Sequence, residues 1–325
     1  MTLNTYTATE IGQCAIAGIK YALAIGGHVA RYTAADFLPG HGGKAYLRIP
    51  GALTARSRDL RDETTAVVFD KIAENRISVD LTKHLVSGVA LGDAELTLDL
   101  KDFVKQVLLP QTDAIADGIE KVLADVLDGV TATDASDGYN EAAPAALFTK
   151  GRRALRDRGV DVANEKLVAF VGGNIVDALL DSGALDFSKT GDADALRQGT
   201  LGRIHGFTAV ETSRGIGADE VVFTTASGIY LATAAPVVPE GANFGETVTK
   251  DGLTVRYLRD YDASTLRDRS VVSTFVGAGI TPLYEVQRDY DTGEATVSDV
   301  EGGAVVKLTT AAPEDIEDDD NIEEG

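Results

Sequence analysis

The sequence has no tryptophan, one cysteine, one methionine and only four histidines. Aromatic residues make up 6% of its 325 residues, while hydrophobic residues make up 44%. This composition excludes a disordered chain, and it requires a core built mainly from Val, Ile, Leu and Ala. Because Cys14 is the only cysteine, no intrachain disulfide can form, and we expect Cys14 to be a small buried apolar side chain.

Basic residues are scarce as well, with 30 Lys and Arg against 51 Asp and Glu, so that the net charge is 30 − 51 = −21. A strongly acidic chain is soluble and repels the phosphates of nucleic acids, which argues against a sequence-specific DNA or RNA reader. Eight of the acidic residues lie in the stretch EDIEDDDNIEEG at 314–325. We expect this run to be a solvated tail.

The sequence also lacks a long hydrophobic run. Its longest weakly apolar stretch, AIAGIKYALAIGG, is too short to cross a membrane and contains Lys20. The opening MTLNTYTATE has neither the basic nor the apolar region of a secretory signal. These absences predict a soluble protein that folds in the cytoplasm and has no membrane partner.

Enzyme motifs are missing too. The sequence contains no G-x-S-x-G nucleophile elbow, no H-E-x-x-H pair and no complete phosphate-binding loop. Its histidines stand at no spacing typical of metal ligands: His28, His41, His84 and His205. We therefore predict no catalytic, cofactor-binding or metal-binding residues. The alternative is a salt-adapted cytosolic enzyme whose site is assembled from distant residues.

The first third of the sequence predicts a helix, an irregular arm and a hairpin. Thr7 and Glu10 fit a capping box at the start of a helix over 7–25. A glycine-rich segment at 26–51 is typical of an extended arm. Residues 44–82 include strand-like pieces with alternating apolar positions, and together they predict a long projecting hairpin.

The strongest helical pattern covers 99–130, where Pro110 predicts a kink or a break. Further along, EKLVAFVGG at 165–173 predicts a buried strand, and helices and strands then alternate without βαβ regularity, which indicates an α+β protein. A helix at 141–159 carries four arginines that we expect to pair with nearby acids rather than to bind phosphate: Arg152, Arg153, Arg156 and Arg158.

Charge is concentrated in YLRDYDASTLRDRS at 257–270, which is balanced although the chain around it is acidic. Dense, balanced charge suits contacts that set the register and partner of an assembly while staying reversible. We expect some members of this cluster to pair across subunits: Arg259, Asp260, Asp262, Arg267, Asp268 and Arg269.

A family resemblance becomes visible between 165 and 216. The buried strand LVAFV is followed by a helix that ends in DALLDS, a variable stretch, and the glycine-punctuated LRQGTLGRIHGFTAVETS. In this order the segment resembles the major capsid (coat) proteins of tailed double-stranded DNA bacteriophages. ENRISVDLTKHLVSGVAL with the helix after it, and LTVRYLRDYDASTLRDRSVVSTFVGAGITPL, extend the resemblance to roughly 44–290. The order of the patterns carries it, since no single motif is specific.

The resemblance implies the Hong Kong 97-like coat fold, an α+β architecture with a long spine helix. The expected parts are an N-terminal arm at 1–43, an E-loop at 44–82, a peripheral domain with the spine helix at 83–135, an axial domain at 136–254, a return to the peripheral domain at 255–312 and the acidic tail at 313–325.

The resemblance also implies a structural protein that self-assembles into hexamers and pentamers of an icosahedral shell. The shell encloses double-stranded DNA without sequence-specific binding, is assembled in the host cytoplasm and becomes part of the virion. Scaffolding, portal and decoration proteins are the implied partners, and no cofactor is implied. An encapsulin-like protein cage of the same fold is the alternative.

Some coats of this kind form Lys–Asn crosslinks between subunits. Lys44 and Lys71 flank the proposed E-loop and are the possible donors. The sequence identifies neither an Asn nor a catalytic carboxylate to match them, so we expect no crosslinks. The proposed arm starts almost at Met1, which leaves no evident scaffolding segment and favours a separate scaffolding protein.

Overall fold

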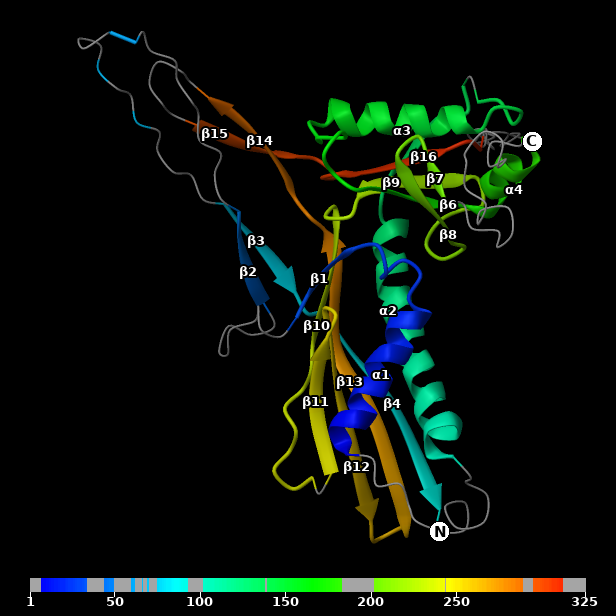
Figure 1. The fold of residues 1–325 in the computed structure, drawn as a ribbon, viewed down its shortest axis with the longest axis vertical. Helices are drawn as coiled ribbons and strands as arrows, with labels where there is room; N and C mark the ends of the chain where they lie inside the picture. Colours follow the sequence, from blue (N-terminus) through cyan, green and yellow to red (C-terminus); the bar gives the residue numbers. More distant parts are fainter. Residues whose placement is uncertain are drawn as a thin grey trace, which may run out of the picture.

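The computed structural model describes most of the chain: residues 7–33, 44–49, 60–61, 66, 69, 75–92, 102–137, 139–182, 202–242, 244–288 and 295–311. The molecule is elongated (Figure 1). One sheet, built around the long strand β13 (Arg267–Ile280), runs along the molecular axis, and a second sheet, built around β6 (Leu167–Val171), lies at one end. We call them the β13 sheet and the β6 sheet.

Strand β13 is long enough to pair with three neighbours. On one edge its first half pairs with β12 and its second half with β10, while β4 pairs with its other edge. The order is β1-β10-β13-β12-β11, with β4 off this path. The strands are β1 (Ala30–Tyr32), β4 (Lys83–Gly92), β10 (Ile229–Ala234), β11 (Phe244–Lys250) and β12 (Leu253–Asp262).

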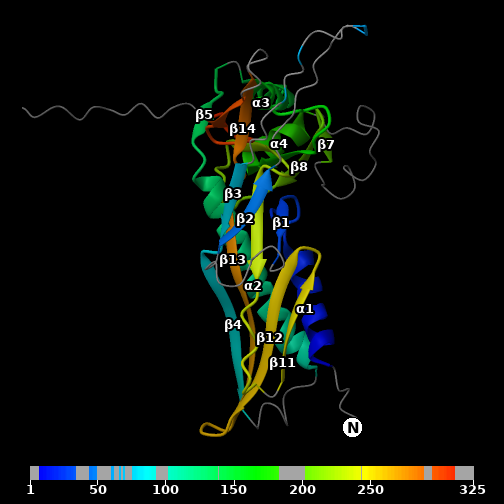
Figure 2. The ribbon, with the colours of Figure 1, turned by 90° about the vertical axis from the view of Figure 1, so that its left-hand side faces the viewer.

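Two helices cover one face of the β13 sheet: α1 (Ala8–Ala22) packs on β11 and β12, and α2 (Leu109–Asp128) packs on β13 and β4. The predicted capping box is present, since Thr7 Oγ1 accepts from the Glu10 N–H and the Glu10 carboxylate accepts from the Thr7 N–H. Figure 2 looks onto the other face, with the helices behind the sheet. No helix in the described ranges is long and apolar enough to span a membrane.

Pro110 changes the helical pitch without breaking the helix. Residues Val104–Leu108 form a π-helical segment, η3, in which the Leu109 N–H donates to the Val104 carbonyl five residues earlier. Proline cannot donate a backbone hydrogen bond, and its ring clashes with the carbonyl four residues before it, so a wider turn relieves both problems. The helix then runs on to Gly129 as its C-cap, which makes α2 roughly 30 Å long at ~1.5 Å per residue.

The β6 sheet has the order β5-β16-β9-β6-β8-β7 and mixes parallel with antiparallel pairs. Every residue of β6 is buried, as the sequence predicted. The elements of this end are β5 (Ala132–Asp134), β7 (Arg203–Ile204), β8 (Phe207–Glu211), β9 (Glu220–Thr225), β16 (Val305–Thr309), α3 (Ala145–Asp157) and α4 (Gly173–Asp181).

Two strand pairs project sideways in Figure 1: β2 (Lys44–Ile49) with β3 (Asn75–Asp80), and β14 (Leu283–Arg288) with β15 (Ala295–Val300). The antiparallel β2–β3 pair agrees with the predicted hairpin, and the segment between its strands lies mostly outside the described residues. At its base the Asp80 carbonyl crosses β13 so closely that a Cβ on Gly277 would lie 1.7 Å from it. Only glycine permits this crossing.

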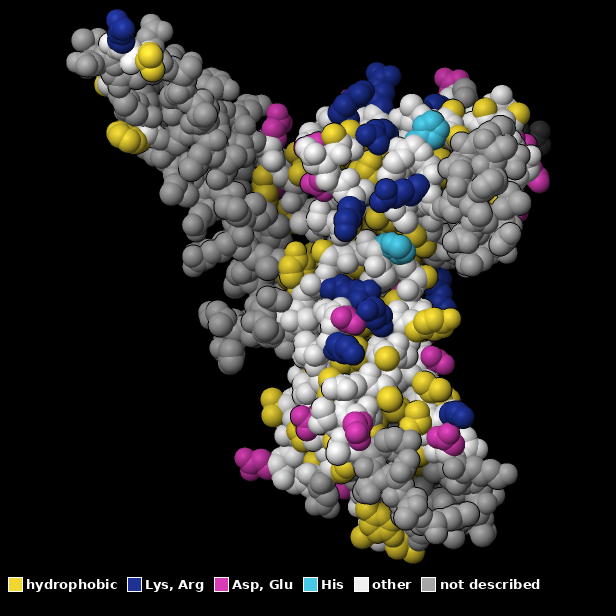
Figure 3. Space-filling model, in the orientation of Figure 1, with side chains coloured by type: hydrophobic (Ala, Val, Ile, Leu, Met, Phe, Trp, Pro, Cys, Tyr) yellow, Lys and Arg dark blue, Asp and Glu magenta, His cyan; other side chains and the backbone are white. Residues whose placement is uncertain are grey.

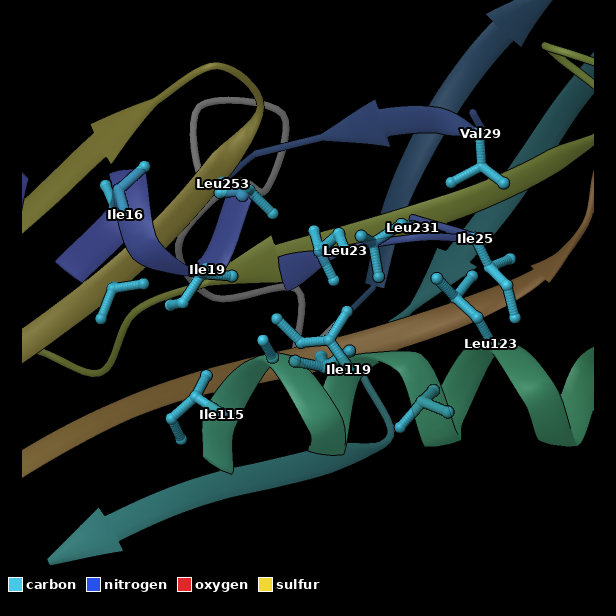
Figure 4. Close-up of a cluster of buried hydrophobic side chains, with 14 of the residues drawn as sticks. Ile16, Ile19, Leu23, Ile25, Val29, Ile115, Ile119, Leu123, Leu231 and Leu253 are labelled. Atoms are coloured by element: carbon cyan, nitrogen blue, oxygen red, sulfur yellow. The ribbon is translucent and has the colours of Figure 1, made fainter. Parts of the chain in front are cut away.

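A shared aliphatic core joins the helices to both sheets. Figure 4 shows Ile19 and Leu23 of the α1 segment above Ile119 of α2, and Ile25 above Leu123. Ile16 belongs to the same cluster. The strand β6 contributes alternate residues to two cores, because successive side chains point to opposite faces. Val168 and Phe170 enter this shared core, whereas Leu167, Ala169 and Val171 enter a second core beneath α3 and α4.

Cys14 is exposed, which corrects the prediction that it is buried. The buried side of α1 is centred on Ile16 and Ile19. At ~100° per residue, Cys14 lies about 200° from Ile16 and therefore on the opposite side of the helix.

Both sheets combine segments that lie far apart in the sequence. Strands β10 and β11 precede residue 254 but belong to the β13 sheet, and β16 follows it but pairs with β9 and β5 in the β6 sheet. The chain therefore crosses between the two sheets several times. Pairing partners far apart in sequence decide this, and local patterns do not reveal them.

A buried carboxylate ties the N-terminal segment to α2. Glu120, which is 4% exposed, accepts hydrogen bonds from the backbone N–H groups of Ile25 (3.1 Å) and Gly26 (2.9 Å). Arg31 donates from Nε and Nη2 to the Gly26 carbonyl at 2.9 and 2.7 Å. Burial lowers the pKa of Arg31, while the charges of Asp251 and Glu120 act in the opposite direction. Glu120 thus binds the N–H groups of this turn, and Arg31 binds its carbonyl group.

We predict that Glu120→Ala lowers the free energy of unfolding by about 3 kcal/mol. Two buried N–H groups would lose their acceptor, at ~1–3 kcal/mol for each unsatisfied group. Urea unfolding of the unassembled protein measures the change. Asp113→Ala, an exposed acid on the same helix, is the matched control and should stay within about 0.5 kcal/mol of the parent. Equal losses in both variants would show that the turn does not depend on Glu120.

Candidate assembly surface

The arginine–aspartate cluster lies on the hairpin formed by β12 and β13. Asp260 stands opposite Arg269, Asp262 opposite Arg267, and Tyr261 opposite Asp268 in the antiparallel register. Because side chains alternate along a strand, the six charged residues divide between the two faces of the sheet. Arg259 and Asp268 share the face that carries the helices, and the other four share the opposite face.

On the helix-covered face, Arg259 and Asp268 form a close ion pair. The Arg259 Nε lies 2.6 Å from Asp268 Oδ2, and its Nη2 contacts the same oxygen. The Arg259 guanidinium also lies 5.1 Å from the centre of the Phe103 ring, at the start of the spine helix. The side chain of Asp268 is only 12% exposed. This pair joins β12 and β13 to the helix, and so it acts within one chain.

On the opposite face, Arg269 bridges two carboxylates. Its Nη2 lies 2.5 Å from Asp260 Oδ2 and its Nη1 lies 3.6 Å from Asp262 Oδ2. Arg267 is exposed and forms no ion pair with any residue that the structure describes. We call Asp260, Asp262, Arg267 and Arg269 the outer charge group. Exposed pairs of this kind contribute only ~0–1 kcal/mol each, so their value for the fold of a single chain is small.

The turn fixes the ionisation of Asp262. Its Oδ1 accepts from the Ser264 hydroxyl at 2.5 Å and from the Ser264 N–H at 2.9 Å. These hydrogen bonds, the hydroxyl first, lower the pKa of Asp262 from its ordinary value of 3.8 to about 2. Asp262 is therefore charged under all but strongly acidic conditions.

Exposed apolar side chains lie beside the outer charge group. Leu266 in the turn is 59% exposed, and Val86 on the neighbouring strand β4, on the same face of the sheet, is 54% exposed. Tyr261, which is 49% exposed, lies opposite Asp268 on the helix-covered face. Figure 3 shows apolar side chains gathered at this tip of the molecule. Apolar groups rimmed by charges are typical of protein–protein contacts. Pairing of the charged residues between subunits stays a prediction, and the outer charge group is the part of the cluster that is free to make it.

Other residues singled out from the sequence lie far from this surface or outside the described ranges. His28, His84 and His205 lie in different parts of the fold, and among the described residues no three His, Cys, Asp or Glu side chains gather as metal ligands would. Lys44 pairs with Asp80 at 3.4 Å. Lys71 and His41 lie outside the described residues, and so does the acidic tail.

The arginines of α3 divide into two kinds. Arg153 and Arg156 both contact Asp157, as predicted. Arg152 and Arg158 donate instead to backbone carbonyls and form no ion pair in the described part of the chain. The charge of Glu301 still acts on Arg158, so only Arg152 departs from the prediction. Their side chains reach β7 and β16, whose positions depend on tertiary structure.

Sequence reasoning missed the polar anchors of the spine helix. Gln111, only 1% exposed, donates to the carbonyls of Ser87 (3.1 Å) and Ser270 (2.8 Å) and accepts from the Ser270 hydroxyl at 2.8 Å. It thereby fixes α2 to β4 and β13. Gln111 and Glu120 are polar residues on the apolar stripe of a helix. This position was the only feature of the sequence that could have indicated buried, hydrogen-bonded side chains.

We predict that Asp262 contributes an acid-sensitive part of the stability. Its pKa is lower in the folded chain (about 2) than its ordinary value (3.8), so the contribution is present above about pH 4 and lost as the pH falls towards 2. The difference in Tm between the parent and Asp262→Asn should therefore be constant above about pH 5 and shrink below pH 4. Thermal unfolding over a pH series measures it. Ser264→Ala removes the principal hydrogen-bond donor to Asp262 and should therefore narrow the pH range over which Asp262 loses its contribution. If the difference in Tm between the parent and Asp262→Asn does not depend on pH, the lowered pKa of Asp262 is contradicted.

No protein-family model and no curated protein matches the sequence. Solved structures do match. The chain is similar over 87% of its length to 89% of a chain of Mycobacterium phage Che8, with a TM-score of 0.53 and 16% identity. For the capsid of Ralstonia phage GP4, the match covers 88% of this chain and 88% of the phage chain, with a TM-score of 0.53 and 10% identity. For the head of Helicobacter pylori bacteriophage KHP40, it covers 86% of this chain and 87% of the phage chain, with a TM-score of 0.53 and 12% identity. Such identities establish the fold alone: the chain has the Hong Kong 97-like α+β fold of phage capsid proteins that its sequence predicted.

Proposed function

We propose that this chain is a structural major capsid protein, a shell subunit and not an enzyme. The observation that carries the proposal is the extent of the likeness, which covers 86–88% of this chain and 87–89% of the three phage chains. A shared fold alone does not imply a shared function, so the features of this molecule have to support the role independently.

The shape of the subunit supports association with other copies. It is elongated, it projects two strand pairs away from its body, and one face of the β13 sheet carries no helix (Figures 1 and 2). Within the described residues, β4 pairs only with β13, so its other edge has no partner strand. Open edges and uncovered sheet faces are typical of surfaces that another chain covers. We infer that copies of this chain associate as hexamers and pentamers of an icosahedral shell.

The proposed shell encloses double-stranded DNA without reading its sequence, and it belongs to the virion after assembly in the host cytoplasm. Scaffolding, portal and decoration proteins are the proposed partners of such a shell. Residues 1–43 and 44–82 are proposed as the arm and the E-loop that reach neighbouring subunits, with peripheral and axial domains built on the β13 and β6 sheets.

Electron microscopy of particles from the native source tests the proposal. We expect large closed shells that contain DNA. Small shells filled with protein would instead identify an encapsulin-like cage, and a discrete small oligomer would favour a salt-adapted enzyme. Denaturing gels of the same particles should show only monomer-sized bands, since the sequence identifies neither an Asn nor a catalytic carboxylate to match Lys44 or Lys71.

We predict that Arg267→Glu reduces the assembled fraction at least about tenfold while leaving the subunit folded. Arg267 has no ion pair within the described chain, so reversing its charge removes no internal ion pair. The new carboxylate stands opposite Asp262 and turns the balanced outer charge group acidic, so that it would repel the acidic surface of a neighbouring subunit. Sedimentation velocity measures assembly, and urea unfolding should shift by no more than about 1 kcal/mol, the size of a like-charge pair across two strands.

The matched control is Lys105→Glu, an equally large charge change at a side chain that is 77% exposed. This variant should assemble like the parent, and Arg267→Lys should restore assembly. Normal assembly of Arg267→Glu would remove the outer charge group from the list of subunit contacts.

A further inference from the structure

A cleft of about 540 Å³ lies between the α1–β1 turn and the β6 sheet. Its walls come from four segments: the turn at His28, the helix α3 at Arg152, the segment leading into β6 at Lys166, and the strand β7 at Arg203. Each wall belongs to, or directly adjoins, a helix or strand that the cores hold in place. The cleft therefore presents its side chains on a rigid frame.

The charges of this cleft are unbalanced. Arg152, Lys166 and Arg203 line it together with a single carboxylate, Glu165, which accepts from the Ser227 hydroxyl at 3.2 Å. None of the three cations forms an ion pair with a described residue. Arg152 is held by backbone alone, through Nη1 to the His205 carbonyl and Nη2 to the Val162 carbonyl, both at 3.1 Å. Two carbonyls orient the guanidinium but leave its charge uncompensated.

Figure 3 shows that this imbalance is part of a larger pattern. Lys and Arg side chains gather on the face in view, from α3 down to the level of β1. This gathering is unexpected in a chain whose net charge is −21. His28 adds no charge at neutral pH, because burial, and then the neighbouring Arg31, lower its pKa. The positive character of the cleft thus comes from Arg152, Lys166 and Arg203.

We propose that this cleft binds the phosphate backbone of double-stranded DNA without sequence preference. Arginine and lysine side chains contact phosphates through charge-assisted hydrogen bonds, and such contacts position DNA but do not read it. The inference rests on the proposed function, and it adds which face of the subunit meets the packaged genome.

The arrangement fits a duplex better than a small anion. The cations come from three separate elements and stand at an open cleft, whereas a small-anion site needs converging, buried donors. A duplex carries one negative charge per ~1.7 Å and can contact all three cations together. Few contacts and an acidic surrounding surface keep the binding weak, which a wall that must admit and release DNA requires.

The test compares the full-length, unassembled protein with the double variant Lys166→Gln/Arg203→Gln. Binding of a short fluorescent duplex of arbitrary sequence is followed by anisotropy between about 50 and 200 mM salt. Each lost phosphate contact lowers the salt slope by ~0.9, so the variant should lose about 1.8. Over this range that change makes its affinity about tenfold less sensitive to salt than that of the parent.

Lys83→Gln/Arg153→Gln is the matched control, because it removes the same two charges from exposed side chains that pair with acids elsewhere. It should keep the slope of the parent. Equal slopes in both double variants, or no binding by the parent, would overturn the inference. Displacement of the duplex by the peptide EDIEDDDNIEEG at a lower concentration than by unlabelled DNA would also overturn it, in favour of an acidic protein segment as the ligand.

Electron microscopy of the same proteins separates the two hypotheses. Shells from all three proteins, with no cleft-dependent DNA binding, would refute this inference and leave the capsid function standing. Cleft-dependent binding by a protein that forms no shells would refute the capsid function and leave the binding site standing.

Discussion

The arrangement of this subunit depends on a buried carboxylate in the middle of its long helix. Glu120 holds the turn between α1 and β1 through two backbone N–H groups, and Arg31 closes the same turn from its carbonyl side. This network sets where α1 lies over the β13 sheet and where β1 joins β10. It also places His28 at the mouth of the basic cleft. One interaction thereby links the N-terminal segment, the helix α2 and a candidate binding surface.

Because side chains alternate along each strand, one face of the β13 sheet packs inside the subunit and the other is exposed to solvent. On the face beneath the helices, Tyr257 and Val272 are fully buried, and the Arg259–Asp268 pair secures the hairpin to the start of the spine helix. On the opposite face, the outer charge group and Val86 meet solvent. A strand period of two therefore gives one hairpin an internal role and an external role. Substitutions on the two faces have different consequences for that reason.

The net charge of the chain does not reveal how its charged residues are distributed. The chain is strongly acidic, yet the cleft between the α1–β1 turn and the β6 sheet holds three cations against one carboxylate. An acidic surface around a small basic cleft restricts polyanion binding to that cleft and keeps it weak and salt-dependent. In the proposed shell, such a surface would let the wall contact DNA without holding it tightly.

The sequence by itself determined the local elements and the fold class. Hydrophobic periodicity located α1, the spine helix and the buried strand β6. Thr7 and Glu10 indicated the capped start of the first helix. The order of the patterns predicted the Hong Kong 97-like fold. Tertiary structure alone decided which strands share a sheet, that Cys14 faces outward, and that Glu120 and Gln111 serve as anchors. It also divided the six charged residues of the hairpin between two faces and brought Arg152, Lys166 and Arg203 together. Local patterns report nearest neighbours along the chain. These features depend instead on contacts between residues far apart in sequence, 159 positions for Gln111 and Ser270 and 200 positions for Ala30 and Tyr230.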